Sequence, residues 1–220
     1  MASMSRKCLI GVIAMSAIAG SACRGHSGRT APADPFATIP VSPVPVGAFS
    51  GANVLLVTVG GVIVGDSASP LPELLARRTA LVEAAYAALD TAVRRDAREV
   101  TWMGLEEQRH FAHRNPTLGL DPDRFATAFL INPELDRIPD PLWSQIRVMA
   151  AVAGARFALV PAGVKLAGYP EAVVATYVLV LADTRTGTVL WRGRVSGPPA
   201  RSAEAALAVT AGFVIATPLH

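Results

Sequence analysis

The chain alternates between short apolar runs and longer stretches in which apolar residues recur at helical spacing. Residues 54–59 form a nearly unbroken apolar, β-branched run, which is typical of a strand buried on both faces. Gly60-Gly61 allow a bulge or bend before a second run at 62–64. The spacing that follows predicts an amphipathic helix of about six turns. Its apolar stripe comprises Leu75, Val82, Tyr86, Leu89 and Val93. Residues 100–102 then predict a short strand.

Capping side chains followed by proline punctuate the middle of the chain. They occur at Asp121-Pro122, Asn132-Pro133 and Asp140-Pro141. An Asp or Asn directly before a proline favours the start of a helix. We therefore expect two short helices and then a longer one that ends at Gly154.

The last part of the chain predicts a three-stranded meander and a helix. Residues 157–166 and 172–182 predict strands, the second apolar on both faces, and 183–187 predicts a hairpin turn with Gly187 at positive φ. In the final strand, three apolar residues on a buried face alternate with polar residues on a solvent-exposed face. The apolar set is Val189, Trp191 and Val195. The polar set is Thr188, Arg192, Arg194 and Ser196. An alanine-rich helix from about residue 201 is expected to pack Ala206, Val209 and Phe213.

This order of elements predicts the fold class. It runs strand, helix, strand, helices, three-stranded meander, helix, which indicates an α/β (α+β) fold with a single mixed sheet of about five strands flanked by helices. We assign residues 51–220 to this globular domain.

The N-terminus has the parts of a secretory leader. Arg6-Lys7, an apolar stretch over 9–19 and the small residues 20–22 predict a signal peptide at residues 1–22. Its apolar stretch is too short to span a bilayer as a helix. Cys23 follows directly, and this arrangement resembles the lipobox of bacterial lipoproteins, in which the cysteine is acylated and becomes the first residue. Ordinary cleavage after the small residues, which would give a secreted or periplasmic protein, is the alternative.

Cysteine usage and the residues after Cys23 extend the lipoprotein interpretation. The other cysteine, Cys8, lies in the leader, so acylation would account for an otherwise lone exported thiol. Residues 23–50 are rich in Pro and Ser, a composition that favours extended, unpacked chain. We therefore expect a lipidated cysteine and a linker that holds the domain off the membrane.

The charge balance argues against nucleic acid as a partner. Removing Arg6 and Lys7 from the 20 Lys and Arg leaves 18 against 17 Asp and Glu, a net charge of +1. Blocks of like charge are absent from the sequence, and few aromatics lie among the arginines. Beyond the leader, every apolar run is too short for a membrane span, so we expect membrane attachment through acyl chains on Cys23.

Two glycine motifs fail as catalytic sites. Residues 60–67 have the glycine spacing of a phosphate-binding loop, but Asp66 stands where the lysine should be. Residues 65–69 resemble a nucleophile elbow, but the second glycine is missing. Outside the polar stretch 106–114, the histidine that follows is His220 at the end of the chain, a poor candidate for the base. We therefore predict no catalytic residues and no cofactor.

Glu106, His110 and His113 are the candidate metal ligands. Their spacing of four and then three residues places them on one face of a helix, and all three are suitable ligands for zinc. Polar neighbours surround them, so a solvent-exposed helix face is the favoured interpretation. These neighbours are Glu107, Gln108, Arg109 and Arg114. A metal-dependent hydrolase that uses the three residues is the alternative function.

Tryptophans are frequent anchors at protein interfaces. Of the candidates Trp102, Trp143 and Trp191, the last lies on the apolar side of its strand. Trp143 lies off the stripe formed by Leu142, Ile146 and Met149, so we expect it to be exposed and to contact a partner.

The order of elements, the lipid-plus-linker layout and the hairpin at 183–187 followed by Val189-Leu190-Trp191 are similar to a periplasmic α/β domain. This domain is shared by the curli-secretion lipoproteins, the lipoprotein activators of penicillin-binding proteins and the N-terminal domain of the Tol translocation protein. The resemblance covers residues 53–217 and implies a non-enzymatic domain that docks on envelope partners. Arg24 replaces the aspartate that retains many lipoproteins at the inner membrane.

The leading hypothesis is thus an adaptor anchored by lipid in the outer membrane, facing the periplasm and binding an envelope protein. A subunit of an export assembly is a further alternative.

Overall fold

The computed structural model describes residues 34–65, 72–168 and 172–215. The chain divides into residues 1–31 and 32–220, and every described residue belongs to the second unit. The predicted leader, Cys23, most of the elbow-like segment 65–69 and the C-terminal His220 lie outside the described residues.

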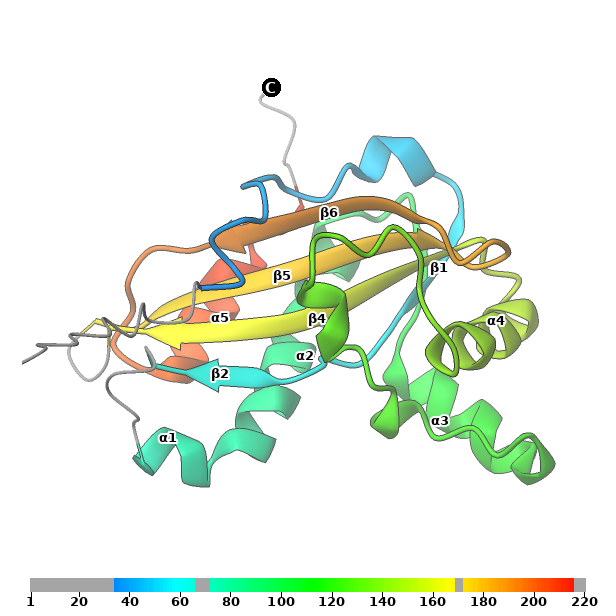
Figure 1. Ribbon diagram of the computed structural model, residues 1–220, viewed down its shortest axis with the longest axis horizontal. Helices are drawn as coiled ribbons and strands as arrows, with labels where there is room; N and C mark the ends of the chain where they lie inside the picture. The colour runs from blue at the N-terminus through cyan, green and yellow to red at the C-terminus, as the bar shows by residue number, and fades with distance from the viewer. Residues whose placement is uncertain (1–33, 66–71, 169–171, 216–220) are drawn as a thin grey trace, which may run out of the picture. The chain divides into compact units, whose positions relative to one another are not determined.

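Within the described residues, six strands form one mixed sheet (Figure 1). Five lie in the order β3-β1-β4-β5-β6, and β2 pairs with the later part of β4. The strands are β1 (Asn53–Leu56), β2 (Val62–Val64), β3 (Thr101–Met103), β4 (Phe157–Ala167), β5 (Val174–Asp183) and β6 (Val189–Ser196). Strands β1 to β4 pair in parallel, whereas β4, β5 and β6 form the predicted antiparallel meander. The predicted fold class is confirmed.

The sixth strand arises because the apolar run 54–64 pairs with β4 in two parts. Val54 is in register with Phe157 and Val62 with Val164, so both parts share one neighbour. Between them the chain bends at Gly60, where an added Cβ would lie 2.4 Å from the carbonyl oxygen of Ala162. Glycine permits this close approach of two backbones, and the predicted bend is confirmed.

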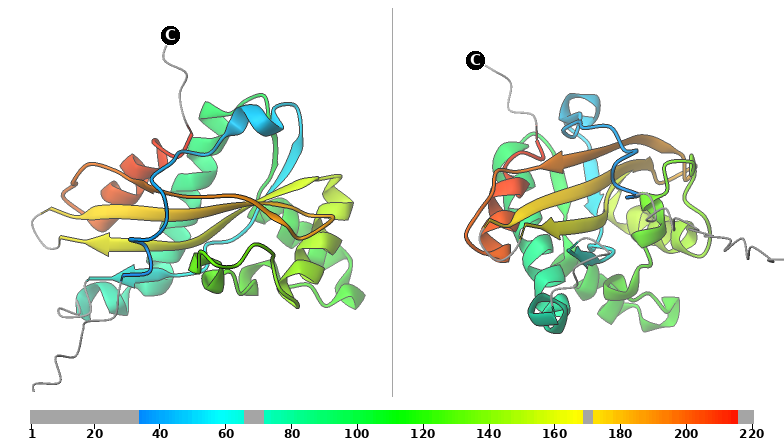
Figure 2. Two further views of the ribbon diagram at one scale, coloured as in Figure 1. Left: turned by 45° about the horizontal axis from the view of Figure 1, so that its top comes forward. Right: turned by 60° about the vertical axis from the view of Figure 1, so that its left-hand side comes forward.

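Helices cover both faces of the sheet (Figure 2). On one face lie α2 (Arg78–Asp96), the preceding α1 (Pro72–Ala76) and α5 (Ala203–Ala211). The other face is covered by α4 (Leu142–Ala153), with α3 (Leu105–Arg114) and short 3-10 turns nearby. Strand β5 alternates between the two cores: Tyr177, Leu179 and Leu181 enter the first, and Val178, Val180 and Ala182 the second. This strand is therefore buried on both faces, as predicted.

Two helices agree only in part with the predicted stripes. In α2, the predicted Leu89 and Val93 are buried, and Val82 and Tyr86 pack against the core while partly buried. Helix α2 buries Leu81, Ala85, Leu89, Ala92 and Val93, whereas the predicted Leu75 in α1 is exposed. Helix α5 packs its small residues inward, and Val209 and Phe213 are 42% and 54% exposed. Leu207 is buried together with these small residues, and α5 contacts both β5 and α2.

The three predicted capping sites behave differently. Asp121 caps the 3-10 turn Pro122–Arg124, its side chain accepting a hydrogen bond from the Asp123 N–H at 3.1 Å. Asn132 instead supports a turn without a helix, accepting from the Glu134 N–H at 3.0 Å. After Asp140-Pro141, helix α4 begins at Leu142 and ends at Gly154, which has φ +60°. Two of the three expected helices are thus present.

Residues 34–50 pack against the domain, and the prediction that this stretch stays unpacked is wrong. Phe36 and Ile39 are 2% and 1% exposed and join the core on the α4 side. Val44, Val46 and Phe49 join the core on the α2 side. We call residues 34–49 the strap, because they pass from one face of the sheet to the other around the outer edge of β6 (Figure 2).

The strap also pairs with this edge strand. Arg194 N–H donates to the Pro40 carbonyl at 2.9 Å, and the Ser42 N–H donates to the Arg194 carbonyl at 3.2 Å. An edge strand presents unpaired backbone groups, and covering them removes a site for unwanted strand pairing. The proline-rich composition is therefore compatible with a docked, non-helical segment, whose apolar side chains supply the burial.

The polar side of β6 is partly covered at Arg192 and Arg194, which corrects the predicted solvent-exposed face, while Ser196 is exposed as predicted. The Arg192 guanidinium donates to the carbonyls of Leu130, Pro133 and Leu135 at 3.2, 2.8 and 2.6 Å. Burial lowers the pKa of Arg192 from its ordinary value. Arg194 lies at the strap, where its Nε is buried without a hydrogen-bond partner among the described residues. Loops that the alternating pattern could not reveal cover this face.

Candidate functional site

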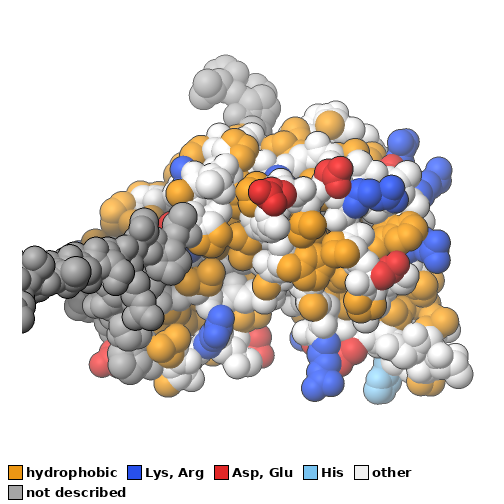
Figure 3. Space-filling model, viewed as in Figure 1, with side chains coloured by type: hydrophobic (Ala, Val, Ile, Leu, Met, Phe, Trp, Pro, Cys, Tyr) orange, Lys and Arg blue, Asp and Glu red, His pale blue; other side chains and the backbone are white. Residues whose placement is uncertain are grey.

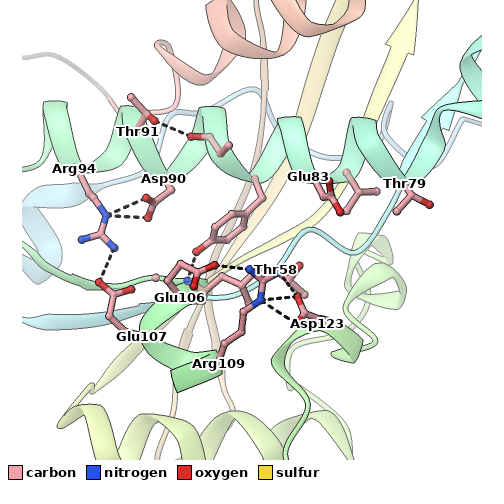
Figure 4. Close-up of a pocket in the computed structure, with 15 residues that line it drawn as sticks. Thr58, Thr79, Glu83, Asp90, Thr91, Arg94, Glu106, Glu107, Arg109 and Asp123 are labelled. Carbon is pink, nitrogen blue, oxygen red and sulfur yellow. Dashed lines mark hydrogen bonds and ion pairs between the residues drawn. The ribbon is translucent and has the colours of Figure 1, made fainter. Parts of the chain in front are cut away.

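A groove of about 820 Å³ lies between α2 and α3 (Figure 4). Thr58, soon after β1, and Gly104-Leu105, directly after β3, border it. The groove therefore lies beyond the carboxyl ends of two parallel strands, where open α/β sheets bind their ligands. We call it the α2–α3 groove.

Carboxylates predominate in the α2–α3 groove. Helix α2 contributes Glu83, Asp90 and Arg94, α3 contributes Glu106, Glu107 and Arg109, and the turn after α3 contributes Asp123. Five carboxylates and two guanidinium groups give this lining a formal charge of −3, although the chain beyond the predicted leader is slightly basic. Low-dielectric walls concentrate such a field in a cleft.

Arg94 joins the two walls of the groove. Its Nε donates to both carboxylate oxygens of Asp90 at 2.9 and 3.1 Å, and its Nη2 reaches Glu107 at 3.3 Å. Desolvation alone would lower the pKa of Arg94, but the hydrogen bond and charge of Asp90 raise it above its ordinary value. Arg94 is therefore a permanent cation that holds α3 against α2.

Arg109 makes a second, more exposed pair of contacts. Its Nη2 donates to Asp123 at 2.6 Å and its Nη1 to Glu106 at 2.5 Å. Hydrogen bonding to Asp123 raises the pKa of Arg109. The side chains of Arg109 and Asp123 are both more than a third exposed, so solvent screens these contacts and partner groups can compete for them.

Tyr86 positions the start of α3. Its phenol oxygen accepts a hydrogen bond of 2.6 Å from the Leu105 N–H, the first residue of α3. Burial, and then the negative charge of Asp90, raise the pKa of Tyr86 above its ordinary value. The phenol stays protonated at neutral pH and serves as a structural cap for a helix whose N-cap residue is Gly104.

The buried side chain of Gln108 attaches α3 to the sheet. It is 0% exposed, and its Nε2 donates to the carbonyls of Leu56 at 2.7 Å and Met103 at 3.2 Å. These carbonyls lie at the ends of β1 and β3. The prediction that Gln108 lies on a solvent-exposed helix face is wrong. Its spacing of three residues from both Leu105 and Phe111, which are also buried, is the signal that could have found it.

The structure does not bring Glu106, His110 and His113 together as a metal site. Glu106 lines the α2–α3 groove and pairs with Arg109, whereas His113 borders a separate hollow beside Pro116 and Asp121. Across the residues described here, no group of three or more His, Cys, Asp or Glu side chains is placed to hold a metal ion. The two histidines lie on the exposed face of α3, as the favoured interpretation expected.

Trp143 packs beneath the β5–β6 turn and is only partly exposed. Its Nε1 donates to the Thr184 carbonyl at 3.3 Å, and the Arg147 guanidinium lies 5.0 Å from the ring centroid. Gly187, at φ +73° as predicted, lies against the indole, where an added Cβ would be 2.9 Å from Cδ1. The expectation of a freely exposed side chain is therefore wrong, and a partner contact by Trp143 stays a prediction.

Arginines surround this end of the sheet. Arg147, Arg156 and Arg185 line a small hollow of about 220 Å³ beside Thr184, and Figure 3 shows basic side chains gathered at the end of the visible face near α4. Arg156 pairs with Asp183 at 3.5 Å. This end of the sheet thus differs in charge from the acidic α2–α3 groove.

The remaining sequence predictions concern the membrane and the other tryptophans. In the part of the chain that is described, no helix combines the length and the apolar character needed to cross a bilayer. Trp102 is buried and donates to the Ala97 carbonyl at 3.2 Å. Trp191 packs against the core as expected, and its Nε1 contacts Ser42 of the strap at 3.4 Å.

No protein-family model matches the chain, and no curated protein sequence matches it. Several solved structures do. The C-terminal domain of LpoB from Salmonella enterica is 18% identical with a TM-score of 0.38, over 68% of this chain and 84% of that one. The PelC dodecamer from Paraburkholderia phytofirmans is 10% identical with a TM-score of 0.38, over 80% and 93%.

Lipoprotein GNA1162 from Neisseria meningitidis is a third such structure, 14% identical with a TM-score of 0.34, over 67% of this chain and 80% of that one. The matches include a bacterial lipoprotein, the class of protein that the predicted resemblance names. At these identities the likeness concerns the fold.

Proposed function

We propose that this protein is a lipid-anchored adaptor of the bacterial cell envelope. Acyl chains on Cys23 hold it in the outer membrane with residues 34–215 on the periplasmic side. The signal pattern over residues 1–22, followed directly by Cys23, supports this anchor. Several acyl chains, each methylene contributing about 0.8 kcal/mol, bind a membrane firmly.

The α2–α3 groove is the proposed docking site for an envelope protein. The observation that carries this proposal is the excess of carboxylates in a groove beyond the ends of two parallel strands. A partner segment that bears Lys or Arg would be attracted by a lining charge of −3. Its cations could then compete for Asp123 and Glu107, whose present ion pairs are partly exposed.

The groove is proposed to bind without catalysis. Both of its guanidinium groups are paired with carboxylates, and Tyr86 is held as a neutral phenol. A nucleophile needs an adjacent base in hydrogen-bond reach. The charged side chains of the groove instead form guanidinium-to-carboxylate hydrogen bonds, which hold its walls together. Trp143, in α4 against the β5–β6 turn, is proposed as a second contact with the partner.

The experiment is crosslinking in native envelopes followed by affinity purification and mass spectrometry. Glu83→Lys reverses a charge on the exposed side of α2 in the groove, and Glu134→Lys makes the same change on an exposed turn that does not line the groove. We expect one envelope protein to be recovered with the wild type and with Glu134→Lys, and recovery to fall about tenfold or more with Glu83→Lys.

Cys23→Ser is the control for the anchor. It should release the protein from the membrane and reduce recovery of the partner, because the two proteins then no longer share one surface. Equal recovery with Glu83→Lys and Glu134→Lys would contradict the groove as the docking site. An unmodified Cys23 in the mature protein would contradict the anchor.

A further inference from the structure

The strap is held at its first described residue. Asp34 Oδ2 accepts a hydrogen bond of 2.7 Å from Lys165 Nζ in β4, whose side chain is 18% exposed. Asp34 Oδ1 accepts from the Phe36 N–H at 3.0 Å, which closes a local turn. Burial alone would raise the pKa of Asp34, but these hydrogen bonds and the charges of Lys165 and Arg194 hold it below its ordinary value.

The attachment continues along the strap. Phe36 and Ile39 are buried in the core. Pro40 and Ser42 exchange backbone hydrogen bonds with Arg194, and the Val44 N–H donates to the Val214 carbonyl at 2.8 Å. The chain therefore follows a defined path over the sheet from Asp34 onward.

Asp34 marks one particular end of the sheet. Its partner Lys165 is in register with Ile63 of β2 and Thr176 of β5, and Thr176 is in register with Ser196 of β6. We call this row of residues the near end. The β5–β6 turn follows Asp183 at the opposite end of β5, seven residues from Thr176, which corresponds to about 24 Å along the strand.

We propose that the near end is the surface of the domain that faces the lipid headgroups, and that the β5–β6 turn faces away from the membrane. This inference rests on the proposed acylation of Cys23. Eleven positions along the chain separate Cys23 from Asp34, and that length spans at most about 40 Å even when fully extended.

The maximum length of about 40 Å applies because the strap is docked on the domain from Asp34 onward. An unpacked chain from Cys23 to Ser50 would cover 27 positions, or up to about 95 Å. On so long a connection the domain could present any side to the membrane. The shorter connection starts at the near end of the sheet. It therefore limits the distance from the near end to the headgroups to about 40 Å. Trp143 and the arginine-lined hollow then lie toward the periplasm.

The mature chain would hold no thiol other than acylated Cys23, which allows a single labelled cysteine. Ser196→Cys places a donor fluorophore at the near end, and Thr186→Cys places the same fluorophore in the β5–β6 turn; both positions are exposed. Acylated protein is reconstituted in phosphatidylcholine vesicles with an acceptor on a fraction of the headgroups. Energy transfer from the near label should be more efficient by about twofold or more, given the separation of about 24 Å.

A second variant carries sixteen Gly and Ser residues inserted between positions 33 and 34, which leaves the strap intact. Transfer from the near label should fall, and the difference between the two labels should shrink. Equal transfer from both labels in acylated wild-type protein, or stronger transfer from Thr186→Cys, would overturn the orientation and leave the anchor standing. A mass spectrum without acyl chains would overturn both.

Discussion

The strap and the α2–α3 groove both lie at the surface of the domain, and they use their residues in opposite ways. The strap buries apolar side chains on both faces of the sheet and adds one ion pair at its start. The groove is walled by ion pairs whose side chains are mostly more than a third exposed. Buried contacts fix a segment in place, whereas exposed ones leave their groups available to a partner.

The largest expected effect comes from removing a buried side chain of the strap. Phe36→Ala should lower the free energy of unfolding by about 3–5 kcal/mol, because it removes an aromatic ring from the core and leaves a cavity. Denaturant unfolding of purified protein measures this. Val41→Ala is the matched control in the same segment, since Val41 is 73% exposed, and it should change stability by less than about 0.5 kcal/mol.

A strap that merely lies on the surface would give the opposite result. In that case Phe36→Ala and Val41→Ala would have equal, small effects, and the contrast between strap and groove would disappear.

Gln108→Ala should have the next largest effect. The carbonyls of Leu56 and Met103 lose their shared donor, and leaving buried acceptors unpaired costs about 1–3 kcal/mol. Hydrogen exchange should also show faster opening of α3. His110→Ala on the exposed face of the same helix should change neither quantity, and added zinc should not alter the unfolding of the wild type. Similar losses in both variants would mean that Gln108 acts only through helix propensity.

Arg109→Ala tests the groove directly and should change stability by less than about 1 kcal/mol, because exposed ion pairs contribute little. Thermal unfolding at low and high salt measures it, and salt should reduce the difference further. A loss comparable with that of Phe36→Ala would show that the groove is a structural element like the strap.

The smallest expected effect is a pH dependence of the strap. The folded-state pKa of Asp34 is below its ordinary value of 3.8. The stabilisation from its contacts is therefore fully present above pH 3.8 and is lost as the pH falls through the lower folded-state value. Asp34→Asn should abolish this component of the acid unfolding profile, while Glu134→Gln should preserve it. An unchanged profile in Asp34→Asn would separate the ion pair from the docking of the strap.

The elements that local sequence could predict are those whose residues satisfy a local rule. The run at 54–59 and the strand 172–182 are apolar on both faces, and both lie between two layers. Gly154 ends α4 and Gly187 takes positive φ in the hairpin, since both positions need a left-handed backbone. These features depend on residues within a few positions along the chain.

The features that were missed depend on contacts between distant residues. Gln108 looks like part of a polar stretch until Leu56 and Met103 supply its acceptors. Arg192 looks solvent-exposed until the loop 130–135 lies over it. The candidate groove likewise combines α2, α3 and Asp123, which no local spacing connects.

The sequence by itself determined the order of the elements, the mixed sheet and its bends. The reason is that hydrophobic periodicity and turn chemistry depend on residues within a few positions of each other along the chain. The tertiary structure decided that the proline-rich strap is packed and that carboxylates from two helices share one groove. It also decided that Glu106 lines this groove whereas His113 borders a separate hollow. The physical reason is that burial and charge are properties of a neighbourhood in space. Phe36 carries no signal of its own until the sheet provides the core that covers it.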